Sequence, residues 1–301
     1  MERTYDLVIA GGGPAGLSAA IYGARAGLST LVIEGMQHGG QIATTDGVEN
    51  YPGFAEPLSG LSLMEKMYAQ AKASGALIEM DEITDVDLAG EIKVLKGMMG
   101  EYRARAVIVA TGAKPKMTLV ECEKQYFHHG ISTCAICDGA FFRGKEVAVI
   151  GGGDSALSEA IYLSGICKKV TIIHRRAEFR ASDVLQKRVR STPGIEFVLG
   201  KNVSHFSGDG KSLTAVALSD GTELPVSGAF VAIGHTPVTG FLRGKLDLDE
   251  QGYIVTRDIV KTSVERVFAA GDVVERTAKQ AIIAAGEGAR AALAAFDALK
   301  A

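Results

Sequence analysis

The sequence DLVIAGGGPAG at residues 6–16 decides the fold prediction. Its first five residues form a short apolar run of strand length, three glycines follow, and an alanine-rich stretch to Ala26 has helical character. A second apolar run, 30–33, then ends at Glu34. Strand, glycine turn, helix and strand in this order are typical of a βαβ unit.

The same pattern occurs again in the sequence EVAVIGGGDSA at residues 146–156. A helical stretch to about Ser164 follows, and then an apolar run, 169–173, that ends in a basic tripeptide. Glycines in such a turn let the backbone come close to a pyrophosphate, whose charge then lies at a helix N-terminus. One copy would also fit an ordinary tight turn of an α/β sheet, but two copies in the same context predict two dinucleotide-binding sites.

The residues at the two strand tips indicate which dinucleotide each site binds. Glu34 can accept hydrogen bonds from a ribose diol, so the first site suits the adenosine of FAD or NAD. The second strand ends in His174, Arg175 and Arg176, with Arg180 shortly after. Cations at this place would pair with a 2′-phosphate. A solvated basic face is the alternative, but the position at a strand end favours NADPH.

Two further strand patterns lie on either side of the second unit. RAVIVATG at 105–112 and RVFAAGD at 266–272 are similar apolar runs that close on a small turn, and an alanine-rich helix follows the second. They extend the first domain, so the second domain is inserted into it, with crossings near 114–116 and 239–240, where turn residues cluster. The predicted fold is α/β, with two Rossmann-like dinucleotide-binding domains of three-layer ββα architecture. Their expected ranges are 1–114 and 243–301 for the FAD-binding domain, in two parts, and 115–242 for the NADPH-binding domain.

A close cysteine pair precedes the second glycine turn, in the sequence CAICD. Two intervening residues place Cys134 and Cys137 near enough to form a disulfide, particularly at a helix start, where the helix dipole also lowers a thiolate pKa. Asp138 could exchange a proton with such a thiolate. A zinc site with the two remaining cysteines would lack a second close pair, and an incidental structural disulfide is unusual in a reducing compartment.

Composition and charge exclude several classes of protein. The chain of 301 residues has 32 Lys and Arg against 35 Asp and Glu, so it lacks the broad basic field of a nucleic-acid-binding protein. No apolar run approaches the roughly 20 residues of a membrane helix, and the N-terminus lacks the pattern of a signal peptide. We therefore expect a cytoplasmic protein with no nucleic-acid or membrane partner.

Taken in order along the whole chain, these motifs resemble the low-molecular-weight thioredoxin reductases. Beside the glycine turns and the cysteine pair, the resemblance covers HGGQ at 38–41, VENYPG at 48–53 and the segment 271–281. It implies an enzyme that passes electrons from NADPH through FAD to the cysteine pair and then to thioredoxin.

The resemblance also implies roles for single residues. In the family the second cysteine, here Cys137, faces the flavin, the first, here Cys134, exchanges with thioredoxin, and the aspartate, here Asp138, acts as acid and base. Family members are homodimers whose NADPH domain rotates relative to the FAD domain. This chain departs from the family pattern in two places, because Lys279 replaces a common arginine and His129 precedes Gly130 where Arg-Gly is common.

The expected cofactor-binding residues form two sets, and no metal site is expected. The FAD set comprises Gly11, Gly13, Pro14, Ala15, Gly16, Glu34, Gly40, Gln41, Asn50, Ile83, Thr111, Gly112, Asp272, Val273, Lys279, Gln280 and Ala281. The NADPH set comprises Gly151, Gly153, Asp154, Ser155, Ala156, His174, Arg175, Arg176 and Arg180.

Three other functions compete with this one. The chain could be a flavoprotein reductase that serves a peroxiredoxin or another thioredoxin-like partner. It could receive electrons from a donor other than NADPH, such as ferredoxin. It could also be a non-enzymatic electron carrier or redox sensor that binds FAD and uses the cysteines only as a switch.

Overall fold

The chain forms two compact units in a computed structural model that describes residues 3–45, 47–274 and 278–300. Unit 1 comprises Met1–Lys114 and Thr236–Ala301, and unit 2 comprises Pro115–His235. The chain passes from one to the other through β7 (Ala113–Pro115) and β16 (His235–Pro237), which pair with each other. Unit 2 is therefore an insertion in the sequence of unit 1. The return at residue 235 lies a few residues before the expected boundary at 242.

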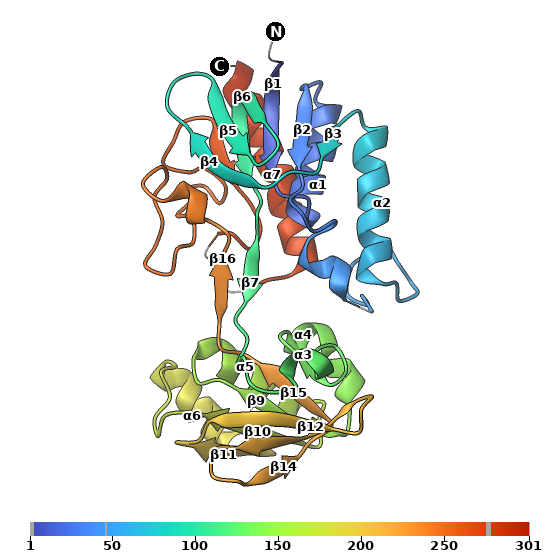
Figure 1. Cartoon of the computed structure of the whole chain (residues 1–301), viewed down its shortest axis with the longest axis vertical. Coiled ribbons are helices and arrows are strands. Elements are labelled where there is room, and N and C mark those ends of the chain that lie inside the picture. Colours follow the sequence, from blue (N-terminus) through green and yellow to red (C-terminus); the bar gives the residue numbers. More distant parts are fainter. Residues whose placement is uncertain (1–2, 46, 275–277, 301) are drawn as a thin grey trace. The chain divides into compact units, whose positions relative to one another are not determined.

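Unit 1 is built on a seven-stranded sheet with the order β3-β2-β1-β6-β5-β4, in which β17 also pairs with β6 (Figure 1). β1, β2, β3, β6 and β17 run parallel, whereas β5 pairs antiparallel with both of its neighbours, β6 and β4. The strands are β1 (Thr4–Ala10), β2 (Thr30–Ile33), β3 (Leu77–Glu79), β4 (Ile83–Asp87), β5 (Lys93–Gly97), β6 (Glu101–Val109) and β17 (Val267–Ala269). The helices are α1 (Pro14–Arg25), α2 (Gly60–Ala73) and α7 (Ala281–Lys300), with 3-10 turns η1 (Gln41–Thr44) and η3 (Gly240–Leu242).

Both faces of this sheet are covered, which explains why β1 is apolar at consecutive positions. Leu7 and Ile9 belong to a core shared with α1, α2 and α7. Val8 and Ala10 belong to a second core, which includes residues of β4, β5 and the segment 242–274. Since side chains alternate between the faces of a strand, a doubly covered strand loses its polar positions. The predicted three-layer ββα architecture is confirmed for this unit.

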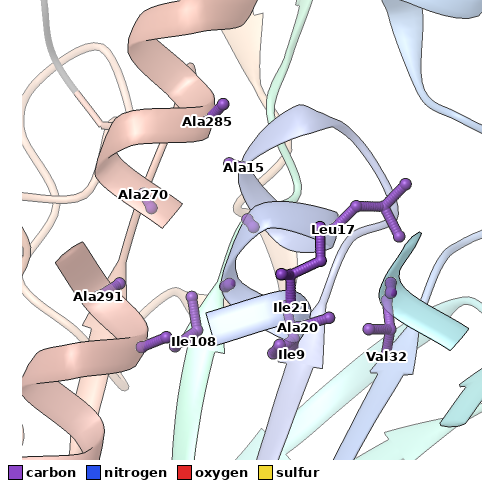
Figure 2. Packing of buried hydrophobic residues seen from close by; sticks show 14 of the residues in the cluster. Ile9, Ala15, Leu17, Ala20, Ile21, Val32, Ile108, Ala270, Ala285 and Ala291 are labelled. Atoms are coloured by element: carbon purple, nitrogen blue, oxygen red, sulfur yellow. The ribbon is translucent and has the colours of Figure 1, made fainter. Parts of the chain in front are cut away.

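Helix α7 packs closely against α1 through small residues (Figure 2). Ala285 and Ala291 on α7 and Ala15 and Ala20 on α1 are buried in the same core. At the closest point, a Cβ on Gly288 would overlap the carbonyl oxygen of Ala15. The alanine-rich composition of the two helices therefore allows the C-terminal helix to reach the first glycine turn.

Replacing Gly288 by alanine is expected to lower the free energy of unfolding by about 1–3 kcal/mol, because the new methyl group meets backbone that cannot rotate away. Gly286→Ala is the matched control, since a Cβ there meets nothing within 4 Å on the same helix. It is expected to leave stability unchanged or to raise it by up to about 1 kcal/mol. Urea unfolding of the two variants measures the difference, and equal stabilities would contradict the close packing of α7 on α1.

Unit 2 repeats this plan with a five-stranded parallel sheet of order β11-β10-β9-β15-β8 (Figure 1). Helices cover one face, and a three-stranded antiparallel sheet covers the other. The parallel strands are β8 (Ile131–Ser132), β9 (Glu146–Ile150), β10 (Lys169–His174), β11 (Ile195–Leu199) and β15 (Gly228–Val231). The antiparallel strands are β12 (Val203–Gly208), β13 (Leu213–Leu218) and β14 (Glu223–Pro225). The helical segments are α3 (Glu123–Tyr126), α4 (Ala135–Asp138), η2 (Gly139–Phe142), α5 (Asp154–Ser164) and α6 (Asp183–Ser191).

Among the residues that the structure describes, no helix combines the length and the apolar character needed to cross a membrane.

Candidate functional site

The first glycine turn joins β1 to α1 and leaves the N-terminus of that helix open. Gly11 has a φ of 121°, and its N–H donates to the Ile33 carbonyl at 2.7 Å. Gly13 is the N-cap residue, has no side chain to cap the helix, and faces open space. The first N–H groups of α1 are therefore available to an anion, as a pyrophosphate requires.

Glu34 lies directly beneath this turn. A Cβ on Gly12 would overlap the Cβ of Glu34, so only glycine at this position allows the backbone of the turn to approach Glu34 this closely. The carboxylate is largely buried, and its Oε2 lies 3.0 Å from Nδ1 of His38. The His38 ring in turn packs edge-on against Tyr68. This partner fixes the orientation of the acid that the sequence assigned to a ribose diol.

The segment after β17 comes back to the same turn. A Cβ on Gly271 would lie 3.0 Å from that of Ala15, and the Gly271 N–H donates to Glu287 Oε2 at 2.8 Å. Burial raises the pKa of Asp272, Lys279 opposes the shift, and Glu287 adds to it. A hollow lined by Gly271, Asp272, Lys279 and Glu287 lies here. Glu287 therefore belongs to the site, although the sequence did not single it out.

Several other members of the FAD set converge on this region of unit 1. A Cβ on Gly40 would lie 3.3 Å from the Cα of Gly13, so the loop before η1 touches the glycine turn. Asn50 Nδ2 donates to Gln280 Oε1 at 3.2 Å. Of the segment 271–281, residues 275–277 lie outside the described part of the chain.

Two members of the FAD set have structural partners elsewhere in unit 1. Thr111 Oγ1 donates to the Val238 carbonyl at 2.7 Å and so ties the end of β6 to the returning chain. Ile83 begins β4 and packs against the core on the other face of the sheet.

The second glycine turn, between β9 and α5, is constructed in the same way. Gly151 has a φ of 155°, its N–H donates to the Ile173 carbonyl at 3.0 Å, and Gly153 is an uncapped N-cap residue that faces open space. A Cβ on Gly152 would overlap the ring of His174. His174 therefore occupies in unit 2 the place that Glu34 occupies in unit 1.

His174 is buried and does not supply the exposed positive charge of the basic tripeptide. Its ring stacks on Phe179, and among the described residues its Nε2 has no hydrogen-bond partner. Burial lowers the pKa of His174, and the charges of Arg180, Arg176 and Arg175 lower it further. The neutral imidazole thus packs beneath the glycine turn, and the exposed positive charge comes from the arginines.

The arginines are held near the turn by their backbone. The N–H groups of Arg180 and Ala181 donate to the Gly152 carbonyl at 2.8 and 3.2 Å, and Asp154 Oδ1 accepts from Ser182 N at 2.7 Å. These bonds fold the segment after β10 back onto the start of α5. Arg175, Arg176 and Arg180 are all exposed, so an anion at the turn can reach them.

The cysteine pair forms a disulfide at the start of α4 in unit 2. Cys134 is the N-cap residue, and its Sγ accepts from the N–H of Cys137 at 3.2 Å. The predicted position at a helix start is confirmed. Cys122 is a half-buried free thiol and Cys167 a buried one. Across the described residues, no group of three or more His, Cys, Asp or Glu is placed to hold a metal ion.

Ser132, the last residue of β8, connects the disulfide to the neighbouring acid. Its hydroxyl donates to Asp138 Oδ2 at 2.6 Å and accepts from the N–H of Cys134 at 3.0 Å. Ser132 is buried, so the bond to the carboxylate is shielded from water. Sequence reasoning missed this residue, and the only available signal was a hydroxyl two positions before the first cysteine.

The residues present fit two dinucleotides of different kinds. Each helix N-terminus is uncapped, and each turn has a glycine whose Cβ position is open where a phosphate would lie. Glu34, which packs beneath the first turn, is an acid that can accept hydrogen bonds from ribose hydroxyls. His174, which packs beneath the second turn, is neutral and is flanked by exposed arginines, and this arrangement suits a phosphorylated ribose.

Known proteins are similar to this chain in both sequence and fold. The chain matches the family described as pyridine nucleotide-disulphide oxidoreductase over residues 5–288. A thioredoxin reductase of Peptoclostridium litorale is 47% identical over 305 residues, which cover 98% of this chain and 97% of that protein. A bifunctional thioredoxin reductase/thioredoxin of Mycobacterium leprae is 43% identical over 97% of this chain and 65% of its own length. The solved structure of thioredoxin reductase from Giardia duodenalis has a TM-score of 0.94 at 39% identity and covers 100% of both chains.

Proposed function

Because the chain belongs to the pyridine nucleotide-disulphide oxidoreductase family, we propose that it is an NADPH-dependent thioredoxin reductase. The observation that carries the proposal is the Cys134–Cys137 disulfide, at a helix start, in a chain with two dinucleotide-binding turns. The cofactors are FAD and NADPH. A reductase that serves a peroxiredoxin is not favoured, because the full-length relatives are named thioredoxin reductases.

FAD would be held in unit 1. The free N–H groups at the start of α1 would bind the pyrophosphate, and Glu34, oriented by His38, would accept from the ribose diol. Asp272 and Lys279, with Asn50 and Gln280, would line the remainder of the site. When bound, FAD supplies a two-electron relay between nicotinamide and disulfide.

NADPH would be held in unit 2. The start of α5 would bind its pyrophosphate, and Arg175, Arg176 and Arg180 would pair with the 2′-phosphate. The neutral His174 supports this assignment, because a carboxylate in its place would repel a second negative charge.

The reduced cysteine pair would act by thiol–disulfide exchange. The Cys134 thiolate attacks one sulfur of the thioredoxin disulfide, forms a mixed disulfide and expels one thioredoxin thiolate. Cys137 then attacks Cys134, which restores the Cys134–Cys137 bond and releases the second thioredoxin sulfur. Asp138 would give a proton to a departing thiolate, and the hydroxyl of Ser132, which donates to Asp138 Oδ2, would hold the side chain in position.

Anaerobic stopped-flow spectroscopy tests the proposal. The purified protein should be yellow, NADPH should bleach the flavin band rapidly, and oxidised thioredoxin should restore it. A colourless protein that releases no flavin on denaturation would contradict FAD binding. A flavoprotein that neither nicotinamide bleaches would instead be an electron carrier or would depend on another donor.

Ser132→Ala is expected to lower kcat for thioredoxin about tenfold, because a hydrogen bond to a charged group contributes about 1.5–3 kcal/mol. The KM for thioredoxin should not change, since Ser132 is buried. Thr133→Ala removes the neighbouring hydroxyl and serves as control. Steady-state kinetics of the two variants, with circular dichroism to verify folding, make the comparison. A Ser132→Ala enzyme as fast as the control would show that the hydroxyl does not position Asp138.

The remaining proposals rest on the family resemblance. We propose that the protein is a homodimer in the cytoplasm and that its partner is a thioredoxin or thioredoxin-like protein. The relative that joins reductase and thioredoxin in one chain supports the partner assignment. Light scattering coupled to size-exclusion chromatography measures the mass, and a mass near that of one chain, 31.5 kDa, would contradict the dimer.

A further inference from the structure

Lys279 carries a positive charge at a place where the local backbone does not favour one. It lies two residues before the start of α7, and the Ala284 N–H donates to the Gln280 carbonyl at 3.0 Å, so Lys279 stands at the N-terminus of that helix. The helix dipole is positive at this end and disfavours a cation. The position of the ammonium group therefore depends on favourable contacts with other parts of unit 1.

One such contact is made with the ring of Tyr253. The Nζ of Lys279 lies over this ring, 4.6 Å from its centroid. Tyr253 is only 9% exposed and Lys279 is half-buried, so the contact is partly shielded from water. The face of an aromatic ring attracts a cation, and the attraction grows as water is removed. Tyr253 therefore stabilises the ammonium group that the helix dipole disfavours.

The backbone holds Tyr253 in place on both sides. The Tyr253 N–H donates to Asp249 Oδ1 at 2.8 Å, and the Tyr253 carbonyl accepts from the Asp249 N–H at 2.9 Å. The next residue, Ile254, donates its N–H to the Val273 carbonyl at 3.0 Å. Val273 directly follows Asp272 in the chain, so these bonds join the turn that carries Tyr253 to the segment that carries Asp272.

The charge of Lys279 also reaches Asp272. Both residues line the hollow beside Gly271, and the Lys279 ammonium group opposes the rise that burial causes in the pKa of Asp272. A Cβ on Gly271 would lie 3.0 Å from the Cβ of Ala15, in the first turn of α1. The Tyr253 ring thus holds a cation in the hollow that adjoins the helix start assigned to the FAD pyrophosphate.

We propose that Tyr253 is a positioning residue of the FAD site, whose ring holds the Lys279 ammonium group so that the hollow presents a fixed positive charge to the dinucleotide. The inference rests on the proposed function, in which unit 1 binds FAD, an anion through its pyrophosphate. A lysine side chain that rotates freely loses conformational entropy when it binds an anion. A side chain already held by an aromatic ring loses less, so the contact strengthens FAD binding by preorganisation.

The test measures the dissociation constant of FAD from the flavin fluorescence that appears on serial dilution of the holoenzyme. Tyr253→Leu removes the ring and is expected to raise the dissociation constant about fivefold. Tyr253→Phe keeps the ring face and should stay within about twofold of wild type. Phe296→Leu is the matched control, because it removes the ring that lies under Lys300 at the other end of α7, and it should change nothing. A Tyr253→Leu holoenzyme that binds FAD as tightly as wild type would overturn the proposal.

A double-mutant cycle separates the contact with Lys279 from a general loosening of the turn. In a Lys279→Met background, Tyr253→Leu should have no further effect on the dissociation constant, because the charge that the ring holds is already absent. If Tyr253→Leu weakened FAD binding by the same factor in both backgrounds, the ring would support the structure alone and the proposal would be wrong.

NMR of lysines that carry isotope-labelled methyl groups after reductive methylation gives a second readout, which needs no Tyr253 variant to fold. The resonance of Lys279, assigned by its absence from Lys279→Arg, should be displaced upfield by the ring current of Tyr253, whereas exposed Lys187 should show no displacement. A Lys279 resonance at the position of Lys187 would overturn the proposal. A wild-type protein without flavin would refute the proposed function as well, and the two failures are distinguishable because the ring-current displacement does not require FAD.

Discussion

Replacing Cys134 by serine is expected to lower thioredoxin turnover on the order of 10³-fold or more, while NADPH still reduces the flavin at the wild-type rate. A serine hydroxyl at this position cannot form the mixed disulfide. Flavin reduction depends on the two dinucleotide sites, and neither contains the cysteine. A thioredoxin-coupled assay measures the first quantity, and anaerobic stopped-flow measures the second.

Cys122→Ser is the matched control, because it removes a half-buried free thiol from the same unit. It should retain full thioredoxin turnover. A Cys134→Ser enzyme that still reduces thioredoxin would refute the assignment of the attacking sulfur. If Cys134→Ser also lost flavin reduction by NADPH, the substitution would have disturbed the structure of unit 2, which circular dichroism would detect.

Sequence patterns located the parallel strands and the helices beside them, because burial on both faces leaves continuous apolar runs. β1 and β9 are examples, and each leads into the glycine turn that was expected. The antiparallel strands were not located. β14 has only three residues, and β12 exposes Ser204 and His205, so neither shows a clear alternation.

In the site, sequence predicted residues whose identity is dictated by backbone geometry or by covalent chemistry. Glycines at the end of a strand, where the backbone must turn sharply, and cysteines with two residues between them are of this kind. It could not predict that His38 contacts Glu34, because the two residues are four positions apart in an irregular loop. It could not predict Glu287 beside Gly271 either, since that contact depends on how α7 packs.

The positive charge at the second turn also needed the structure. Sequence treated His174, Arg175 and Arg176 as one basic tripeptide. The structure separates them, because His174 is buried under Gly152 whereas the two arginines are exposed. Selectivity for NADPH should therefore depend on the arginines rather than on protonation of His174.

Arg175→Ala combined with Arg176→Ala is expected to raise the KM for NADPH at least about tenfold, because each charge-assisted bond to the 2′-phosphate contributes about 1.5–3 kcal/mol. The KM for NADH should change little, since that nucleotide has no phosphate at this position. The preference for NADPH over NADH, measured as the ratio of kcat/KM values, should fall by the same factor. The maximal rate of flavin reduction should be retained, because the arginines do not contact the reacting ring.

A general loss of positive charge must be separated from the loss of specific bonds. Lys187→Ala with Arg188→Ala removes two exposed cations from α6 in the same unit, outside the segment that folds back onto Gly152. If long-range attraction of an anionic nucleotide were the cause, this control would raise both KM values, and the effect would weaken as salt screens it. If the arginines bind the 2′-phosphate, only their removal changes the ratio between the nucleotides. An equal effect of Arg175 and Arg176 on NADPH and NADH would exclude a 2′-phosphate site at the end of β10.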